Sequence, residues 1–385
     1  MEPPSSVQDA VPDQASASTS TSAPASESES APAPAPAPAP TISMISIGTH
    51  SLWTSLSGPP QPTSPSNGDP DPLVVIVPGA GDVASSYVAL ERLLRPFTRV
   101  LLYDRTGLGR SERNPNPPQN RNANANVNSP SPRDDDDGTA VRAAAELHTL
   151  LTALSLAPPY ILLAHSYGGI VAREFLHAHD AAVAGLLLVD CATERSAELL
   201  TFPDPNIVAV MGDLSFAKVS GLRRETVLSD DEWRARARDV RGSGEGAASE
   251  AASFGEVCAT LRSRDQVRKC VLGSRPLVVM RANGVRDYRR VYEAGVAAGF
   301  GSAEEQEGFR ELLGRWEGID EEVQRGQMGL ARPGEEGGVS RFVRVEDVGH
   351  FVHLVRPAVI AEQVRWVREV VLEQIGSARG IGLRL

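Results

Sequence analysis

A serine stands in a short turn between an apolar run and a segment with helical spacing. Ser166 follows the apolar residues 160–163 and precedes the helix-like residues 170–176, with the small residue Gly168 beside it. Where a strand turns sharply into a helix, a serine hydroxyl is exposed at the tip of the turn, and the first amides of the helix face the atom that it attacks. The pattern therefore predicts that Ser166 is a nucleophile.

A serine attacks efficiently only when a base accepts its proton and a third group orients that base. His350 is the candidate base, because it lies after the last predicted strand and before the closing helix. That position would bring it to the same edge of the sheet as Ser166. We expect His353 to pack within the protein or to orient the loop, and His165 to point into the fold.

The third group is an acid, and two aspartates are candidates. Asp190 ends the strand predicted after the Ser166 helix, and Asp287 lies a few residues past the strand predicted at 276–280. Both satisfy a chain order of serine, then acid, then histidine. Either aspartate could instead cap a helix or hold a loop. The residues alone leave the two candidates open.

Two backbone amides are candidates for an oxyanion hole, which stabilises the negative charge that develops on a substrate oxygen. The Tyr167 amide directly follows Ser166, and the Ala80 amide lies in the Gly-rich turn 78–81. A phosphate site would need the Gly-Lys-Ser/Thr ending of a P-loop or the G-x-G-x-x-G spacing, and the turn has neither. We therefore expect no nucleotide site there.

Short apolar runs alternate with helical patterns along most of the chain. This alternation predicts an α/β fold with a mostly parallel central sheet, right-handed crossovers and flanking helices. A leading hairpin is expected at 42–47 and 51–56, further strands at 73–77, 99–103, 160–163, 185–190, 276–280 and 341–345, and helices at 85–94, 139–154, 170–176 and 359–371.

Residues 193–275 interrupt the alternation. They contain no convincing strand, and we predict several helices joined by Gly-rich loops such as 241–244. An insertion after the strand that ends at Asp190 would sit above the carboxyl ends of the strands, where parallel sheets bind ligands. We predict a helical lid between two parts of one core, residues 42–192 and 276–376.

Three segments have the composition of tails or loops. Residues 1–41 are rich in Ser, Ala and Pro and are expected to be disordered, because such a segment cannot bury enough apolar surface to offset its ordering entropy. Residues 114–137 are predicted to form a surface loop insertion, and residues 377–385 a tail. The four adjacent carboxylates of Asp134 to Asp137 repel one another, and we interpret them as a solvated loop rather than a metal site.

The overall charge excludes some classes of partner. The chain of 385 residues has 38 basic and 49 acidic residues, a formal net charge of −11, which argues against a nucleic-acid or anionic-membrane surface. Cys191, Cys258 and Cys270 are widely spaced and predict reduced thiols in the cytoplasm. No apolar run approaches the roughly 18 to 20 residues of a membrane span, and the N-terminus lacks the features of a signal peptide. The oligomeric state stays open.

Several segments together resemble the α/β-hydrolase superfamily. The resemblance covers nearly all of residues 42–375 apart from the low-complexity loop 114–137. The Asp-Arg-x-Gly-x-Gly-x-Ser run at 104–111 is the most specific of these segments. The others are the Gly-rich turn 78–81 (where most members have His-Gly), the serine turn 164–169, and the segments 188–190 and 349–354. The resemblance implies an α/β-hydrolase fold with Ser166 as nucleophile, His350 as base, and the Tyr167 and Ala80 amides as oxyanion hole.

The chain departs from the family pattern at three points. Ala164 replaces a glycine and should be tolerated, whereas Pro78 replaces a histidine that commonly braces the oxyanion loop. The strand at 276–280 is not followed by the usual Gly-x-x-Asp, and Asp287 falls about two residues late. Because some members carry the acid at the end of the preceding core strand, the resemblance favours Asp190, with Asp287 as the alternative.

The nucleophile type narrows the chemistry. Family members that open epoxides or cleave carbon–halogen bonds use aspartate at the Ser166 position, so serine implies acyl transfer: cleavage of an ester, thioester, lactone or amide of a small substrate through an acyl-enzyme. Such a reaction needs no metal and no organic cofactor. An acyltransferase or lyase on the same fold, or a ligand-binding protein with slow turnover, are the alternatives.

Overall fold

The computed structural model describes residues 39–60, 71–115, 139–201, 203–332 and 339–382. Three parts of the predicted tails and loop lie outside these ranges: most of the tail 1–41, all but the first two residues of the insertion 114–137 (including Asp134 to Asp137), and the last residues of the tail 377–385.

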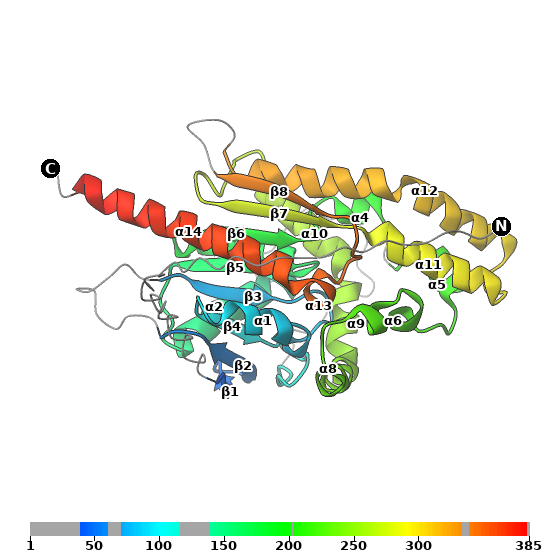
Figure 1. Cartoon of the computed structure of the whole chain (residues 1–385), viewed down its shortest axis with the longest axis horizontal. Coiled ribbons are helices and arrows are strands. Elements are labelled where there is room, and N and C mark those ends of the chain that lie inside the picture. Colours follow the sequence, from blue (N-terminus) through cyan, green and yellow to red (C-terminus); the bar gives the residue numbers. More distant parts are fainter. Residues whose placement is uncertain (1–38, 61–70, 116–138, 202, 333–338, 383–385) are drawn as a thin grey trace, which may run out of the picture. The chain divides into compact units, whose positions relative to one another are not determined.

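A single sheet of eight strands forms the centre of the described fold (Figure 1). Its order is β1-β2-β4-β3-β5-β6-β7-β8, and every pair from β4 to β8 is parallel, whereas β1 and β2 are antiparallel to their neighbours. The predicted sheet and leading hairpin are confirmed. The strands are β1 (Thr41–Ser46), β2 (Ser51–Ser57), β3 (Leu73–Val77), β4 (Val100–Tyr103), β5 (Tyr160–His165), β6 (Val183–Val189), β7 (Leu277–Ala282) and β8 (Ser340–Val345).

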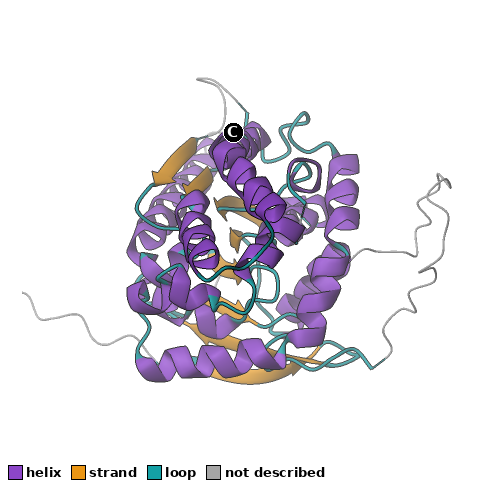
Figure 2. Cartoon of the chain, turned by 90° about the vertical axis from the view of Figure 1, so that its right-hand side faces the viewer, coloured by secondary structure: helices purple, strands orange, loops and turns teal. Residues whose placement is uncertain are grey.

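Helices cover both faces of the sheet, because successive side chains of each central strand point to opposite faces. Residues Val75 and Leu162 pack with α2 (Thr139–Ala153), α3 (Gly168–Ala178) and α10 (Phe254–Arg264) on one face. Residues Ile76 and Leu163 pack with α1 (Val88–Leu94) and α14 (Pro357–Gly382) on the other. Figure 2 shows the strands enclosed between helices. Within the ranges that the structure describes, no helix combines the length and the apolar character needed to cross a membrane.

The insertion between β6 and β7 is helical, as predicted, and no strand occurs among its described residues. It consists of α4 (Ser196–Leu199), α5 (Pro205–Met211), α6 (Phe216–Val219), α7 (Leu222–Glu225), α8 (Asp230–Gly242), α9 (Gly244–Ala252) and α10. The Gly-rich loop expected at 241–244 is wrong: Ser243 alone separates α8 from α9. The glycines stand at helix ends, where their lack of a side chain is tolerated.

Two unpredicted helices and two element boundaries also differ from the prediction. Two helices, α11 (Gly284–Ala297) and α12 (Ala303–Gly326), fill the segment between β7 and β8, where none was predicted. Thr41 begins β1 rather than ending a tail, and α14 continues through residues 377–382, since no proline there stops the helix. The short helix α13 (Val352–Val355) precedes α14, and single 3-10 turns lie at Ala84–Ser86, Asp180–Ala182 and Gln327–Leu330.

The burial of the sheet makes a first prediction. Leu163 of β5 is fully buried, whereas Leu93 of α1 is 40% exposed. Leu163→Ala should lower the free energy of unfolding by about 2–5 kcal/mol through lost burial and a residual cavity, and Leu93→Ala by less than about 1 kcal/mol. Urea unfolding of both variants followed by circular dichroism measures the difference. Equal effects would contradict the described packing of β5.

Candidate active site

Ser166 occupies a strained turn between β5 and α3. Its φ of +54° lies in the left-handed region, which costs a non-glycine residue roughly 1–2 kcal/mol. Three backbone hydrogen bonds hold this conformation: the Ser166 amide donates to Val189 (3.1 Å), and its carbonyl accepts from Gly169 and Ala192 (3.0 Å each). The predicted strand–serine–helix turn is therefore present, with the Ser166 side chain half-buried.

Small residues allow this turn to sit close to the neighbouring strand. A Cβ on Gly168 would lie 2.2 Å from the Val77 carbonyl oxygen at the end of β3, so any side chain there would displace the backbone. Ala164, which stands where the family pattern has glycine, is fully buried within β5 and fits the core. The replacement of that glycine is tolerated, as expected.

His350 forms a hydrogen-bonded pair with Asp190. Their Nδ1 and Oδ2 atoms are 2.6 Å apart, and because a carboxylate only accepts, His350 Nδ1 carries the proton and Nε2 stays available as a base. The other carboxylate oxygen, Oδ1, accepts the Ala282 amide at 3.0 Å. Asp190 itself has a φ of +49°, and its amide donates to Met280 of β7 at 2.7 Å. The neighbouring strand thus fixes the orientation of the Asp190 carboxylate.

Asp287, the alternative acid, lies near His350 but does not pair with it. It occupies the first turn of α11, is buried, and pairs with Arg286 at 3.4 Å. Its carboxylate abuts the backbone just before His350, because a Cβ on Gly349 would lie 1.8 Å from Asp287 Oδ2. Among the described residues no hydrogen bond joins Asp287 to His350. Burial raises the pKa of Asp287 to about 6. Of the two predicted acids, the structure brings Asp190 to His350.

A third carboxylate, Asp320 of α12, was missed from the sequence. Its Oδ2 accepts from Arg281 Nε at 2.7 Å. Burial, and then the negative charge of Asp190, raises the pKa of Asp320 to about 7, although Arg281 acts in the opposite direction. Nothing in the acidic sequence of α12 distinguishes Asp320 from its exposed neighbours, since only the packing of that helix buries it.

The carboxylates around His350 outweigh its burial. Burial alone would lower the pKa of His350, but the hydrogen bond to Asp190 and the charges of Asp190, Asp320 and Asp287 raise it above its ordinary value of 6.5. These surroundings therefore stabilise the protonated imidazole relative to an imidazole in water. A base that must carry a positive charge during a reaction benefits from such surroundings.

The turn that carries Ala80 is braced by Arg105. Arg105 Nη1 donates to the Pro78 carbonyl and Nη2 to the Gly79 carbonyl, at 2.6 Å each. The N–H of a trans peptide points opposite to its C=O, so the Ala80 amide faces away from Arg105. A Cβ on Gly79 would lie 3.2 Å from Ser166 Cβ, which puts this turn in contact with the serine.

The two candidate oxyanion amides share one property, which is the lack of a hydrogen-bond acceptor among the described protein residues. Within the described ranges, neither the Ala80 amide nor the Tyr167 amide donates to another protein group. The brace that Pro78 was expected to remove is supplied by Arg105 and by Tyr87, whose Oη accepts the Gly79 amide at 3.2 Å. Arg105 lies in the Asp-Arg-x-Gly run, so its motif was visible in the sequence while its contact was not.

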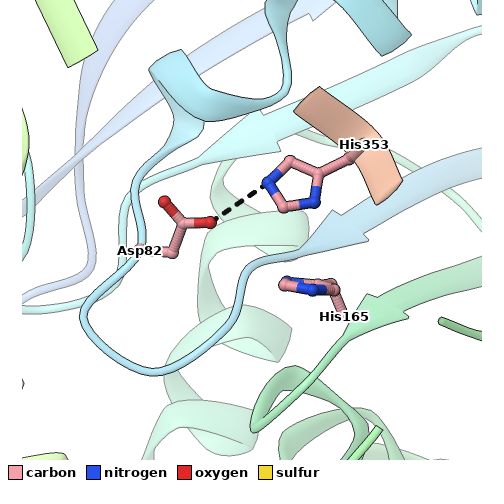
Figure 3. Close-up of side chains that lie close together, drawn as sticks. All are labelled: Asp82, His165 and His353. Atoms are coloured by element: carbon pink, nitrogen blue, oxygen red, sulfur yellow. Dashed lines mark ion pairs between the residues drawn. The ribbon is translucent and has the colours of Figure 1, made fainter. Parts of the chain in front are cut away.

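A cluster of buried polar side chains lies beside this turn. Figure 3 shows Asp82, His165 and His353 close together, with Asp82 facing the His353 ring. Asp82 Oδ2 lies 3.4 Å from His353 Nε2. The His353 ring stacks on Tyr87 with centroids 4.2 Å apart. Burial lowers the pKa of both histidines, which favours their neutral forms.

The cluster has the spacing of a metal site but not a complete donor set. One ligand atom from each residue lies within 4.8 Å of the others. Both His165 nitrogens are already engaged, however: Nδ1 with Tyr87 Oη at 3.1 Å and Nε2 with the His350 carbonyl at 3.0 Å. Only Asp82 and His353 then offer available ligand atoms, fewer than the three or four of a zinc site. The contacts agree with the expectation that His165 points into the fold and His353 packs.

Known protein sequences are similar to this chain over most of its length. The family model described as "Alpha/beta hydrolase family" matches residues 74–363. A Gibberella zeae protein described as an AB hydrolase superfamily protein is 29% identical over 330 residues, which cover 83% of this chain and 92% of that protein. The "Probable transporter efuK" of Hormonema carpetanum is 25% identical over 352 residues, and these cover 88% of this chain but 44% of that protein.

Solved structures share the fold. A candidate epoxide hydrolase from Pseudomonas aeruginosa superposes with a TM-score of 0.53 at 14% identity, over 88% of this chain and 98% of that chain. A candidate lipase from Acinetobacter baumannii AYE has a TM-score of 0.52 at 14% identity, over 87% of this chain and 93% of that chain.

The charges around His350 make a prediction that needs no substrate. Where Asp320 is ionised, above its pKa of about 7, Asp320→Asn removes a negative charge that favours the imidazolium, so the pKa of His350 should fall. In the unmodified protein the pKa of His350 should lie above 6.5. NMR titration of the imidazole resonances measures both values. His177, exposed on α3, is the internal control and should not respond. An unchanged His350 pKa would mean that Arg281 neutralises Asp320 too well for it to act on the site.

Proposed function

Because the chain belongs to the alpha/beta hydrolase family and is therefore a hydrolase, we propose that it cleaves an ester, thioester or lactone-type acyl bond of a small organic substrate through an acyl-enzyme on Ser166. One observation carries this proposal: His350 is hydrogen-bonded through Nδ1 to Asp190 at 2.6 Å, with its other nitrogen available as a base. The strained turn at Ser166, with its φ of +54°, supports the same assignment.

The reaction would begin with proton transfer. His350 Nε2 accepts the proton of the Ser166 hydroxyl as Oγ attacks the substrate carbonyl carbon, and the carbonyl oxygen becomes an oxyanion. The Ala80 and Tyr167 amides donate hydrogen bonds to that oxygen. The imidazolium of His350, stabilised by Asp190, then gives its proton to the leaving group, and an acyl group stays on Ser166. His350 then takes a proton from water as the water oxygen attacks the acyl carbon, the bond from that carbon to Ser166 Oγ breaks, and His350 returns the proton to Oγ as the acid leaves.

Asp190 would act by orientation and charge. Its hydrogen bond with His350 selects the tautomer that leaves Nε2 unprotonated, and its negative charge stabilises the imidazolium that forms during attack. The Ala282 amide holds the second carboxylate oxygen at 3.0 Å, so the acid does not have to reorganise during the reaction. Epoxide opening, by contrast, would require a carboxylate nucleophile at the position that Ser166 occupies.

The nucleophile can be tested without knowledge of the substrate. A fluorophosphonate probe should label the protein, and Ser166→Ala should abolish both the labelling and the hydrolysis of p-nitrophenyl acetate. Ser274→Ala is the matched control, because Ser274 is an exposed serine outside the site and its loss should leave both signals unchanged. Intact-mass analysis measures the added phosphonyl group.

Two outcomes would redirect the proposal. A folded protein that is not labelled would exclude a working serine nucleophile and favour a ligand-binding role. Labelling together with transfer of the acyl group to an added alcohol, in preference to water, would identify an acyltransferase instead of a hydrolase.

The two aspartates can be separated by rate. Asp190→Asn keeps the size of the side chain but favours the wrong His350 tautomer, and kcat should fall by about 10⁴, as in the best-studied serine triad. Asp287→Asn should change kcat by less than about tenfold, because no hydrogen bond links Asp287 to His350 among the described residues. Steady-state kinetics on p-nitrophenyl acetate measures both. Small and equal losses would argue against Asp190 as the acid.

A further inference from the structure

Helix α9 of the insertion touches the turn that carries Ala80. Glu250, near the end of α9, accepts the Gly81 amide at 2.8 Å and the Arg105 Nε at 2.7 Å. A further contact joins Arg105 Nη2 and Glu250 Oε2 at 3.0 Å. Both side chains are nearly buried, Arg105 with 3% and Glu250 with 11% exposure. The insertion and the core are thus joined by a buried ion pair.

This pair fixes the peptides on both sides of Ala80. Arg105 holds the carbonyl of the Gly79–Ala80 peptide, and Glu250 holds the amide of the Ala80–Gly81 peptide. With both peptide planes held, the direction of the Ala80 amide is set, since only the two backbone torsions of Ala80 join the planes. Glu250 also holds Arg105 in the position from which it reaches Gly79.

A second set of contacts links the end of α9 to Tyr167. Ser253, which directly follows α9, has its Oγ 2.6 Å from Thr139 Oγ1, and Thr139 Oγ1 lies 2.9 Å from Tyr167 Oη. The Arg105 guanidinium lies over the Tyr167 ring, 5.6 Å from its centroid. The residue that carries the other candidate amide therefore contacts the same assembly.

We propose that Glu250 is a positioning residue, and that docking of α9 through the Glu250–Arg105 pair orients the Ala80 amide for the oxyanion. The inference rests on the proposed function, because it concerns the oxyanion hole of that reaction. Removal of the Glu250 carboxylate would release the Gly81 amide and leave Arg105 buried without its partner, which is costly in a low-dielectric interior. The Ala80 amide would then lose part of what fixes its direction, since the Asp82 amide still donates to the Gly79 carbonyl at 3.1 Å. Ser166, His350 and Asp190 keep their positions.

The test separates transition-state from ground-state binding. Glu250→Gln puts an N–H₂ donor where one carboxylate oxygen accepts. In one orientation this donor faces Arg105 Nε, and in the other it faces both Arg105 Nη2 and the Gly81 amide. With p-nitrophenyl acetate, kcat should fall by about 10- to 100-fold, a part of the loss seen when an oxyanion donor is removed outright. KM should change by less than about twofold.

The inhibition constants of two related ketones measure how well the proposed oxyanion hole stabilises a negative oxygen. A trifluoromethyl ketone forms a bond from its carbonyl carbon to Ser166 Oγ, the hydroxyl proton moves to His350, and the ketone oxygen becomes negative. The corresponding methyl ketone binds as a neutral carbonyl. In Glu250→Gln the inhibition constant of the trifluoromethyl ketone should rise by the same factor as kcat falls, and that of the methyl ketone should stay the same.

Two further variants serve as a control and as a charge-preserving test. Glu245→Ala is the matched control, because Glu245 lies on the same helix but pairs at the surface with Arg113, and its loss should change neither inhibitor. Glu250→Asp keeps the charge that compensates Arg105 but is one methylene too short to reach both partners, so it should fold and show a smaller loss of kcat. It decides the question if Glu250→Gln fails to fold.

The failures are distinguishable. If unmodified protein is not labelled by the fluorophosphonate, the proposed function is wrong and this inference falls with it. If the protein is labelled and the folded Glu250 variants keep their kcat, only the inference is overturned. An equal weakening of both ketones would also overturn it, because α9 would then be a wall of the binding site and not a support of the oxyanion hole.

Discussion

Two non-glycine residues in left-handed backbone conformations, at the ends of neighbouring parallel strands, are the constraint on which the site depends. Ser166 follows β5 with a φ of +54° and Asp190 follows β6 with a φ of +49°. Each conformation costs roughly 1–2 kcal/mol, so each persists only because surrounding bonds over-determine it. The Ser166 amide bonds to Val189 of β6, and the Asp190 amide bonds to Met280 of β7. Each turn is therefore held by the next strand of the sheet.

These hydrogen bonds between neighbouring strands explain how residues that are distant in the sequence meet. The pairing of β5, β6 and β7 aligns the carboxyl ends of the strands at one edge, and the sharp turns there direct two side chains out of the sheet. Asp190 reaches His350, 160 residues further along the chain, because the loop after β8 emerges at the same edge. The position of the proposed acid is thus a property of sheet order, not of local sequence.

The fold could be predicted from the sequence because its signals are local. Buried parallel strands such as β3 and β5 are continuous apolar runs, and the serine turn between strand and helix has a recognisable pattern. The choice between Asp190 and Asp287 could not be made from the residues alone, since both follow a predicted strand and only the geometry shows which one His350 contacts. Helix α12 was missed, and with it Asp320, because its acidic residues resemble an exposed segment.

The contacts of Arg105 could not be predicted from the sequence, for a different reason. Its motif was visible, but its partner Glu250 lies 145 residues away in the insertion, and neither residue has a neighbour in sequence that points to the other. A buried ion pair is also not what stability alone would select, because apolar residues of similar volume often stabilise a protein as well or better. Its hydrogen bonds to the backbone of Pro78, Gly79 and Gly81 give the pair a role besides stability, which is to hold the turn that carries Ala80.

The site is consequently divided between two parts of the chain. Backbone bonds between strands of the core sheet hold the proposed nucleophile and acid, and the acid in turn holds the proposed base, His350, by a hydrogen bond. The turn that carries the proposed oxyanion amide of Ala80 is braced by Arg105 and Tyr87 of the core, and the insertion adds further contacts. Glu250 of α9 pairs with Arg105, and Nη2 of Arg236 in α8 lies 3.7 Å from Oδ1 of Asp82, which directly follows the turn. In the proposed reaction, proton transfer from Ser166 and stabilisation of the oxyanion at Ala80 therefore differ in part of their support. Loss of the α9 contacts would weaken the hold on the Ala80 turn and leave in place the strand bonds that position Ser166 and Asp190.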